Sequence, residues 1–483
     1  MGREEQIIQE RIRKLQELKN LKIDTYPAIS DKKQNCFECL NSKIGSSVKT
    51  AGRLMTKRDL GKIAFSKLKD QFGEIQIVFQ EKETPEKISE FFKKYIDVGD
   101  FVEVSGKTFK TKTKETSILV KDAKILSKSI LPLPEKYHGL KDDEEKLRKR
   151  YLDILMNSEV QEMFLKKAKF WNAIREFLLK REFVEVETPV LESSAGGATA
   201  KPFVTHHNSL DLDVYLRISM GELWQKKLMV AGFEKTFEIG RQFRNEGMDM
   251  EHLQDYTQME FYWGYADYKK GMQLVEEMYK EVAKKVFETL KFKTHGYEID
   301  LGKKWEVYDY EKTIEKYTKI NIYKTDKKEI MKKLKELNLD FDPDADKWRM
   351  IDLLWKYCRK KLSGPGFLTG QPVELTPLAK RIPEDPRKVQ QFQIIIAGTE
   401  LGNGYSELND PLDQEERFKE QMKQKSAGDE ESMEHDKSFV EALKYGMPPT
   451  CGFGVSERLF SYLMDKPIRE CVIFPLMKPE EEK

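Results

Sequence analysis

Two strand-like runs and a charged segment between them occupy residues 235–265, which read KTFEIGRQFRNEGMDMEHLQDYTQMEFYWGY. The runs are Lys235 to Ile239 and Gln258 to Tyr265, and both alternate apolar or aromatic residues with polar ones. Arg244 lies beside a glycine-containing turn, where an arginine can hold a phosphate with two hydrogen bonds, and Glu246 can accept from an adenine amine. The segment therefore predicts a strand pair with charged side chains, which either hold a phosphate or form ordinary surface ion pairs.

Helical patterns surround this strand pair. The stretches 160–180 and 269–292 have apolar residues at helical spacing, so an α+β domain is expected here. A lysine-rich segment at about 297–365 interrupts the domain. In it Asp326 and Glu329 predict a capping box for a helix that carries Ile330, Leu334 and Leu337, so we expect a helical insertion.

A different pattern comes before residue 130. Short alternating runs fall at 48–54, 63–68, 75–79, 101–109 and 117–126, with one helix-like segment at 85–95. Five strands in this order suit a small Greek-key barrel of the oligonucleotide-binding type, the OB-fold. Phe65, Gln76 and Lys57 on its strands are an aromatic, an amide and a cation, which are groups that stack on unpaired bases or hydrogen-bond to them.

The N-terminal residues 3–23 predict an amphipathic helix whose basic face includes Arg11 and Lys14. That face either contacts nucleic acid or is plain surface on a helix docked to the next domain. The first 130 residues hold 27 Lys and Arg against 19 Asp and Glu, although the whole chain has a net charge of only +2. Such a basic excess attracts phosphate backbones, and a solvated lysine-rich surface is the alternative.

Composition limits the class of protein. With 483 residues the chain has room for two or three units, and 39% hydrophobic and 35% charged residues describe a folded soluble protein. No stretch reaches the about 20 apolar residues of a membrane span and no signal peptide precedes residue 20, so a cytoplasmic protein without membrane contact is expected. Cys36 and Cys39 alone are a weak zinc or redox signal, and we interpret them as ordinary structural cysteines.

The usual nucleotide motifs do not occur: there is no Walker loop, and the glycines at 452–457 lack the third one of a dinucleotide fingerprint. Several separate strings, in order, instead resemble the class II lysyl-tRNA synthetases from about residue 45 to 478. The first family signature is similar to 183–189, followed by the loop 196–198 and Lys201 to Phe203. The second is similar to 243–247 through 260–262 and 265–268, and the third to 452–458. Two more strings favour lysine over the aspartate and asparagine relatives, namely 376–380 and 400–411.

This resemblance implies a domain organisation and a reaction. It implies a lead-in helix at 1–45, an OB-fold anticodon-binding domain at 46–130, a linker at 131–145 and a catalytic domain at 146–483. The catalytic domain would be an antiparallel sheet flanked by helices, paired as a homodimer through Pro189 and the helix before it. ATP would activate L-lysine to lysyl-adenylate, and the lysyl group would pass to the 3′ end of tRNA(Lys).

The resemblance also assigns the nucleotide site. Arg244 would hold the substrate carboxylate and the α-phosphate, Glu246 the adenine amine, and Arg458 the adenine face and γ-phosphate. The catalytic set would be Arg244, Glu246, His252 and Arg458, and Tyr256 and Glu400 would complete the ATP site. Mg²⁺ would lie at Glu400, with Gln393 and Glu407 as further candidates. Gln393 stands where the family has a second acidic ligand, and a neutral oxygen holds magnesium more weakly.

For the amino acid, the resemblance implies Gly196, Glu222, Arg244, Glu260, Tyr262, Asn403, Tyr405 and Glu407. Glu407 would pair with the ε-ammonium beside Tyr262, and Glu222 with the α-ammonium. Two further departures from the family affect this region, because the stretch 218–221 is one residue longer than usual and the string 452–458 is one residue shorter. In the barrel, the implied anticodon readers are Lys57, Phe65, Gln76 and Glu115.

Other functions remain open at this point. One is a related enzyme, either an aspartate or asparagine synthetase or a paralogue that lysylates a protein. The barrel argues against that paralogue, and Glu407 argues against an acidic substrate. A tRNA-binding protein that has lost catalysis is the second alternative, and the presence of Arg244, Glu246 and Arg458 argues against it.

Overall fold

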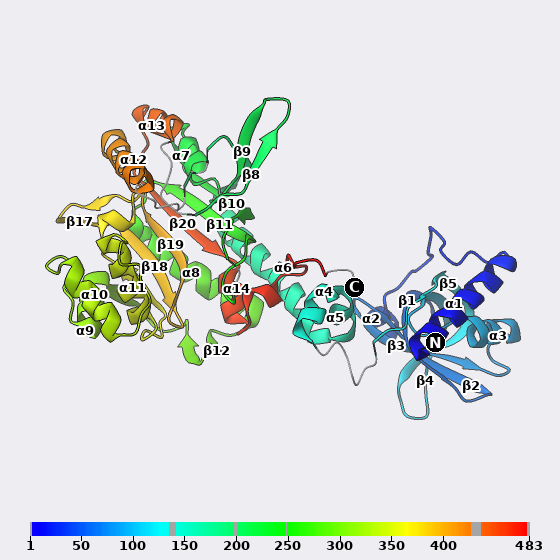
Figure 1. The fold of residues 1–483 in the computed structure, drawn as a ribbon. Coiled ribbons are helices and arrows are strands. Elements are labelled where there is room, and N and C mark those ends of the chain that lie inside the picture. The colour runs from blue at the N-terminus through cyan, green and yellow to red at the C-terminus, as the bar shows by residue number, and fades with distance from the viewer. Residues whose placement is uncertain are drawn as a thin grey trace. The chain divides into compact units, whose positions relative to one another are not determined.

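The computed structural model describes residues 2–134, 142–194, 196–197, 200–247, 249–426 and 436–480. The chain forms two compact units, Met1–Met156 and Asn157–Lys483 (Figure 1). Of the linker expected at 131–145, residues 135–141 lie outside the described part. The first unit ends with two short helices after the barrel, α4 (Asp143–Arg148) and α5 (Arg150–Met156).

The first unit contains the predicted barrel, which is closed in the strand order β1-β2-β3-β5-β4. Its elements are β1 (Ser47–Asp59), β2 (Ile63–Asp70), β3 (Gly73–Gln80), α3 (Glu86–Tyr95), β4 (Phe101–Lys110) and β5 (Thr116–Ser127). All five predicted strands and the helix between the third and fourth are confirmed. Phe79 and Phe92 stack with ring centres 3.9 Å apart, so α3 packs on one side of the apolar barrel core.

The short helix α2 (Cys36–Leu40) fills another part of this core. Asn35 and Glu38 form a capping box at its start. Cys36 and Cys39 are both buried in the core as free thiols, and burial raises the pKa of Cys36 to about 12. The two cysteines are therefore core residues, and neither is a surface cysteine.

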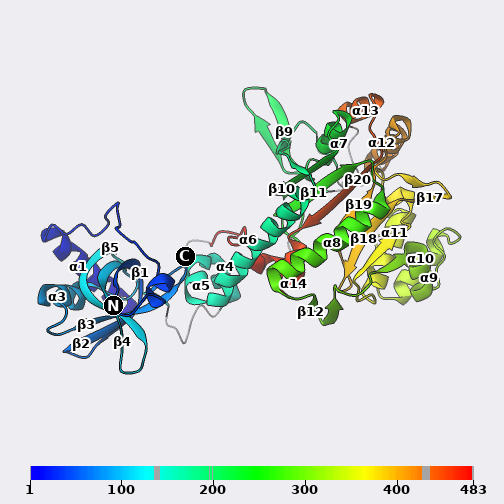
Figure 2. The ribbon, with the colours of Figure 1, turned by 180° about the vertical axis from the view of Figure 1, so that it is seen from behind.

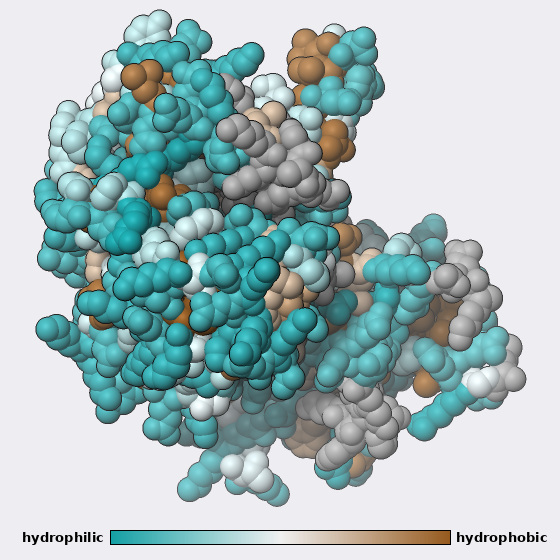
Figure 3. Space-filling view, turned by 60° about the vertical axis from the view of Figure 1, so that its left-hand side comes forward, coloured by the Kyte–Doolittle hydropathy of each residue, from teal (hydrophilic) through white to brown (hydrophobic). Residues whose placement is uncertain are grey.

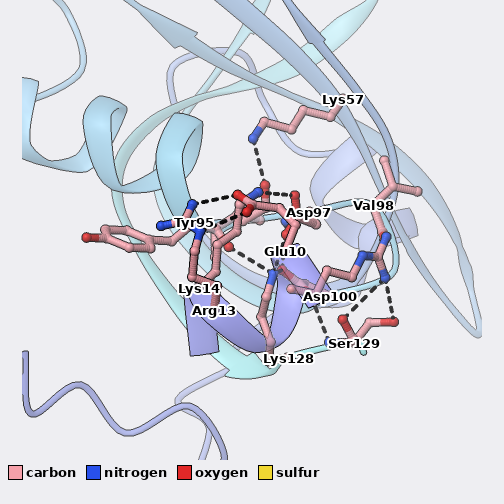
Figure 4. Close-up of polar contacts among 12 residues, drawn as sticks. Glu10, Arg13, Lys14, Lys57, Tyr95, Asp97, Val98, Asp100, Lys128 and Ser129 are labelled. Carbon is pink, nitrogen blue, oxygen red and sulfur yellow. Dashed lines mark hydrogen bonds and ion pairs between the residues drawn. The ribbon is translucent and has the colours of Figure 1, made fainter. Parts of the chain in front are cut away.

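The N-terminal helix α1 (Arg3–Asn20) is docked on the barrel by two of its basic residues (Figure 4). Arg11 is buried and donates to the carbonyls of Val98 and Leu131, each at 2.8 Å. Lys14 pairs with Asp97 at 2.7 Å. These two cations serve the packing of the helix, so the nucleic-acid reading of the basic face is wrong for them.

A fully buried lysine connects this docking site to the end of the barrel. Lys128 pairs with Asp97 at 2.6 Å and with Asp100 at 2.8 Å, and it donates to the Tyr95 carbonyl at 2.9 Å. Buried charges are tolerated when they are paired and hydrogen-bonded in this way. The ends of α3 and β5 and the middle of α1 thus meet in one polar network.

The second unit is built on an eight-stranded sheet in the order β14-β15-β18-β19-β20-β11-β10-β6. The strands are β6 (Val184–Glu185), β10 (Lys235–Phe243), β11 (Asp255–Gly264), β14 (Glu306–Asp309), β15 (Gly366–Thr369), β18 (Gln391–Ile396), β19 (Thr399–Ser406) and β20 (Thr450–Ser456). The predicted antiparallel sheet is confirmed for the six inner strands, while β6 and β14 pair in parallel at the two edges.

Two long helices, α6 (Ser158–Leu179) and α8 (Tyr268–Phe287), lie side by side across one face of this sheet (Figure 2). They cover a core that includes Phe170, Phe177, Phe261, Phe392 and Phe453. The other face of the sheet carries the polar side chains described below. Burial of one face leaves the second free to hold ligands.

The remaining elements surround this sheet. They are β7 (Leu191–Glu192), β8 (Val204–His207), β9 (Leu212–Leu216), α7 (Glu222–Val230), β12 (Lys291–Thr294), β13 (Tyr297–Asp300), the 3₁₀ turn Val373–Leu375, β16 (Arg381–Ile382), β17 (Asp385–Val389), α12 (Pro411–Ser426), α13 (Lys437–Lys444), α14 (Arg458–Leu463) and the 3₁₀ turn Ile468–Cys471. In the described part of the chain no helix is long and apolar enough to span a membrane. The face shown in Figure 3 is mostly hydrophilic.

The later part of the predicted insertion forms three helices, α9 (Tyr310–Thr318), α10 (Lys327–Glu336) and α11 (Lys347–Arg359), which pack in one core with Leu368 of β15 and Ile395 of β18. Its first part is not helical, because β13 pairs with β12 and β14 is an edge strand of the main sheet. Asp326 caps α10 by accepting from the Glu329 amide at 2.9 Å. A capping box also requires the Glu329 side chain to accept from the Asp326 amide. That part of the prediction is wrong, because Glu329 accepts from the Thr325 hydroxyl at 2.6 Å. A nearer hydroxyl donor competes successfully for that carboxylate.

The docking of α1 can be tested with two arginines of the same helix. Arg11→Ala should lower the free energy of local opening of residues 3–20 by about 2–4 kcal/mol, since it leaves buried carbonyls without their donor. Arg13→Ala should have little effect, because Arg13 makes only exposed ion pairs with Glu10 and Glu17. Amide hydrogen exchange on the full chain measures both, and equal protection in the two variants would contradict the anchoring role.

Candidate active site

A cavity of about 430 Å³ opens on the polar face of the sheet, over β11, β18, β19 and β20. Eleven of the predicted site residues line it: Glu222, Arg244, Tyr256, Glu260, Tyr262, Gln393, Glu400, Asn403, Tyr405, Glu407 and Arg458. Three do not, namely Gly196, Glu246 and His252. The sheet therefore gathers in one place residues that are more than 200 positions apart in the sequence.

Two glycines of β20 create the space. Gly452 lies opposite Tyr262 on one neighbouring strand and opposite Tyr405 on the other, and Gly454 lies opposite Glu260. A Cβ atom on Gly452 would be 2.1 Å from Glu407 Oε1. Glycine thus keeps open a narrow slot between the tyrosines and Glu407.

The helix α7 brings Glu222 to the same slot, and its first turn depends on Gly221. This residue has a φ of +66°, and a Cβ atom here would lie 2.1 Å from Thr188 Oγ1. Both observations require glycine. The stretch 218–221 therefore ends in a left-handed turn, after which α7 begins at Glu222.

Three buried carboxylates meet around the slot. Glu222, Glu260 and Glu407 are only 7%, 6% and 2% exposed. Tyr262 donates to Glu260 at 3.2 Å, and Tyr405 donates to Glu222. Burial raises the pKa of Glu260 to about 7 and that of Glu407 to about 8. Such a concentration of desolvated negative charge suits a ligand with positive groups.

The sequence analysis missed one charged residue of this cluster. The Lys226 ammonium lies 2.9 Å from Glu222 Oε1 and 2.6 Å from Glu407 Oε2, and its side chain is 1% exposed. The signal that could have revealed it is the spacing, because a lysine four residues after a glutamate on a helix can reach back to it. Two smaller residues of the cavity lining, Gly197 and Ser219, were also missed.

Two guanidinium groups mark the other end of the cavity. Arg244 lies with its guanidinium carbon 5.9 Å from the centre of the Tyr256 ring. Arg458 donates to Glu251 and to Thr399, each at 2.6 Å, and its buried Nε has no hydrogen-bond partner in the described part of the chain. Two cations on one wall can hold the oxygens of a phosphate chain.

The three predicted site residues that do not line the cavity are close in the sequence to residues that do. Glu246 and His252 are exposed on the segment that joins β10 to β11, and His252 Nδ1 lies 2.8 Å from Asp249 Oδ2. Gly196 lines a small neighbouring cavity that shares Ser219 with the larger one. In this structure the nucleotide roles of Glu246 and His252 are thus not formed.

The candidate metal ligands separate into two kinds. Glu400 and Gln393 lie on the adjacent strands β19 and β18, and both line the cavity. Trp355 and Arg359 of α11 contact Glu400 Oε1 at 2.6 and 3.1 Å, so its second oxygen is left for a ligand. Glu407 is not a suitable metal ligand, because the Lys226 ammonium occupies its Oε2 side. No group of three His, Cys, Asp or Glu residues with metal-binding geometry occurs among the described residues.

Three of the four predicted anticodon readers lie on the outer surface of the barrel. Gln76 donates to Glu115 at 3.1 Å and accepts from Ser117 at 2.9 Å. Phe65 is half-buried between the inward-facing Ala64 and Ser66 and is not part of the barrel core. An aromatic face and an amide are thus presented on neighbouring strands.

Lys57 has a different place. Its ammonium donates to the carbonyls of Phe92, Lys93 and Ile96 at 3.0, 2.8 and 2.6 Å, where it caps the end of α3 (Figure 4). Burial lowers the pKa of Lys57 to about 8. All three donors of the amine are engaged, so the structure contradicts a base-reading role for Lys57 in this conformation.

Comparison with known proteins agrees with this arrangement of two sites. Residues 142–478 match the family model described as tRNA synthetases class II (D, K and N), and residues 48–126 match that of the OB-fold nucleic acid binding domain. The lysine–tRNA ligase of Thermosipho africanus is 42% identical over 98% of this chain and 97% of its own length. That of Thermoanaerobacter pseudethanolicus is 45% identical over 93% and 90%, and that of Thermotoga maritima 41% over 98% and 96%. The cavity, the barrel and these relatives together show that the chain belongs to the lysine–tRNA ligases of class II.

Proposed function

We propose that the cavity binds L-lysine and ATP in a defined arrangement, with the amino acid over the three carboxylates and the phosphates between the two arginines. The observation that carries this proposal is the charge distribution of one cavity. The strand register separates the charges: the Glu407 amide donates to Thr450 at the start of β20 and Glu260 lies opposite Gly454, whereas Arg244 and Arg458 follow the ends of β10 and β20. Lysine has two ammonium groups and ATP has a polyanionic tail, so each substrate matches one end.

The first step joins lysine, at one end of the cavity, to the α-phosphate of ATP, at the other. A lysine carboxylate oxygen attacks the α-phosphorus, and pyrophosphate leaves with the electrons of the broken phosphoanhydride bond. No proton moves, so the residues need only orient the reactants and balance charge on the phosphate oxygens. Arg244, between Ile218 and Tyr256, would hold the carboxylate and the α-phosphate, and Arg458 the γ-phosphate. Tyr256 would stack under the adenine.

The second step transfers the lysyl group to tRNA. A hydroxyl of the terminal ribose attacks the carbonyl carbon of the adenylate, the bond to phosphate breaks, and AMP leaves with the proton of that hydroxyl. Gln258 and Asn403 are neutral hydrogen-bonding groups of the lining near the reacting carbonyl in this arrangement. Glu246 and His252, on the segment after β10, would reach the nucleotide if that segment closes over it.

Magnesium would be held by Glu400 and Gln393 together with the phosphates. Both side chains face the cavity, and one ionised and one neutral oxygen suit an ion that keeps most of its ligands from water and phosphate. When bound, Mg²⁺ would neutralise charge on the phosphates.

The carboxylates also set the choice of amino acid. An aspartate substrate would place a fourth carboxylate near Glu407, which is unfavourable, so an aspartate or asparagine enzyme fits this cavity poorly. An amino acid without the distal amine would leave the buried Glu407 unpaired and should be rejected strongly. An amino acid one methylene shorter loses only about 1–3 kcal/mol.

We further propose a homodimer that works in the cytoplasm, where translation takes place. A group of large apolar side chains along α6 and the following strands is exposed in the single chain: Leu165, Leu179, Val184, Val190 and Leu191. Apolar exposure on this scale is typical of an interface. Leu191→Glu should shift the chain from dimer to monomer in sedimentation equilibrium, and a wild-type chain that sediments as a monomer would refute the dimer.

Glu407→Gln tests the amino-acid site, because it keeps the shape and removes the charge. In lysine-dependent ATP–pyrophosphate exchange we expect the KM for lysine to rise at least about 30-fold and the KM for ATP to change little, since only the ammonium loses its partner. Glu192→Gln is the matched control, a buried glutamate that does not line the cavity. Equal losses for lysine and ATP would mean that Glu407 is structural.

A second experiment separates anticodon reading from chemistry. Phe65→Ala should weaken tRNA binding by about 1–3 kcal/mol if the ring stacks on an unpaired base, while lysine activation without tRNA stays unchanged. Gln76→Ala should weaken cognate tRNA more than a tRNA with an altered anticodon, because an amide reads a base edge. Equal losses on every tRNA, or a large fall in melting temperature, would show that these residues only support the barrel.

A further inference from the structure

Lys226 is the one fully buried cation beside the cavity within the described part of the chain, and it does not line the cavity itself. It lies in α7, one turn after Glu222. The rings of Tyr405 and Phe439 each have their centres 5.6 Å from its ammonium. The ammonium is therefore enclosed by two aromatic faces and two carboxylates, on the side away from the cavity.

Each of these carboxylates has one oxygen turned to Lys226. Glu407 gives Oε2, at 2.6 Å, and Glu222 gives Oε1, at 2.9 Å, which also accepts from Tyr405. The other oxygen of Glu407 faces the slot, because a Cβ on Gly452 would lie 2.1 Å from it. The other oxygen of Glu222 accepts no hydrogen bond from the described residues, and Glu222 lines the cavity.

The formal charges of the three carboxylates and Lys226 match the charges of the two ammonium groups of lysine. Glu222, Glu260 and Glu407 would carry three negative charges when ionised, and Lys226 balances one of them. Two charges remain, which equals the number of ammonium groups on lysine. Without Lys226 the empty cluster and the occupied one would each contain one more uncompensated buried charge, which is costly.

We propose that Lys226 is a positioning residue for lysine selection, which holds Glu222 and Glu407 from behind so that their outer oxygens meet the two ammonium groups of the substrate. This inference rests on the proposed function of the cavity. It differs from a purely structural ion pair between α7 and the end of β19, which would stabilise the fold without affecting one substrate more than the other.

Burial supports the same assignment. It raises the pKa of Glu407, whereas the ammonium of Lys226 opposes that rise. The titratable groups that interact with Glu407 are Lys226 and Glu222 from α7, Glu260 and Tyr262 from β11, Tyr405 from β19 and Cys451 from β20. Lys226 is the only cation among them, so its removal would leave Glu407 more protonated and less able to pair with an ammonium.

The test is lysine-dependent ATP–pyrophosphate exchange with Lys226→Met, which keeps much of the length and removes the charge. We expect the KM for lysine to rise about 10-fold or more, with the KM for ATP and kcat changed less than about 3-fold. Lys227→Met is the matched control, because that neighbouring lysine bonds to Ser438 and lies over Trp224, outside the cavity. It should leave both KM values unchanged.

A double-variant cycle with Glu407→Gln shows whether Lys226 acts through Glu407. In the Glu407→Gln background, Lys226→Met should raise the KM for lysine by a smaller factor than in wild type. A lysine KM within 2-fold of wild type for Lys226→Met overturns the proposal. So does a parallel rise of both KM values with a lower melting temperature, which is the signature of a structural role.

If Lys226→Met does not fold, Lys226→Gln replaces it, since glutamine keeps hydrogen-bond donors and loses only the charge. A lysine KM within 2-fold of wild type, or a parallel rise of both KM values with a lower melting temperature, then overturns the proposal in the same way. Failure of the proposed function gives a different result: wild-type protein would show no exchange that depends on lysine. An active wild type with an indifferent Lys226 variant refutes only the inference about Lys226.

Discussion

Three carboxylates buried around one slot are the constraint on which the catalytic unit depends. Removing a carboxylate from water costs several kcal/mol unless a partner compensates it. Here the compensation comes from Lys226, from the hydroxyls of Tyr262 and Tyr405, and from the raised pKa of Glu260 and Glu407, which lets them hold protons while no cation is bound. The buried carboxylates are therefore compensated within the fold, and they match the two ammonium groups of the proposed substrate.

The surrounding structure follows from that requirement. Gly452 and Gly454 of β20 keep the floor of the slot free, and the left-handed turn at Gly221 starts α7 where Glu222 reaches it. The insertion contributes as well, because Trp355 and Arg359 of α11 fix one oxygen of Glu400. The rigid sheet, packed on α6 and α8, holds these side chains in place before any substrate arrives.

The barrel unit also compensates charges that are removed from water, but there the charges are positive. Its buried cations Arg11 and Lys128 and the half-buried Lys57 are satisfied by carbonyls and by Asp97 and Asp100, and they fix α1 and the end of α3 (Figure 4). The surface with Phe65, Gln76 and Glu115 lies outside this network. The residues that anchor α1 are thus different from those proposed to read the anticodon.

The sequence by itself determined the strand pattern of the barrel, the helical insertion and the strings that converge on the cavity, because alternation, capping residues and the order of motifs are local properties. Partners that depend on distant chain segments were decided only by the tertiary structure. Lys57 looked like a base reader and instead caps α3, since three carbonyls lie within reach of its amine. No sequence string singled out Lys226, and only the meeting of α7 with the end of β19 places its ammonium between Glu222 and Glu407.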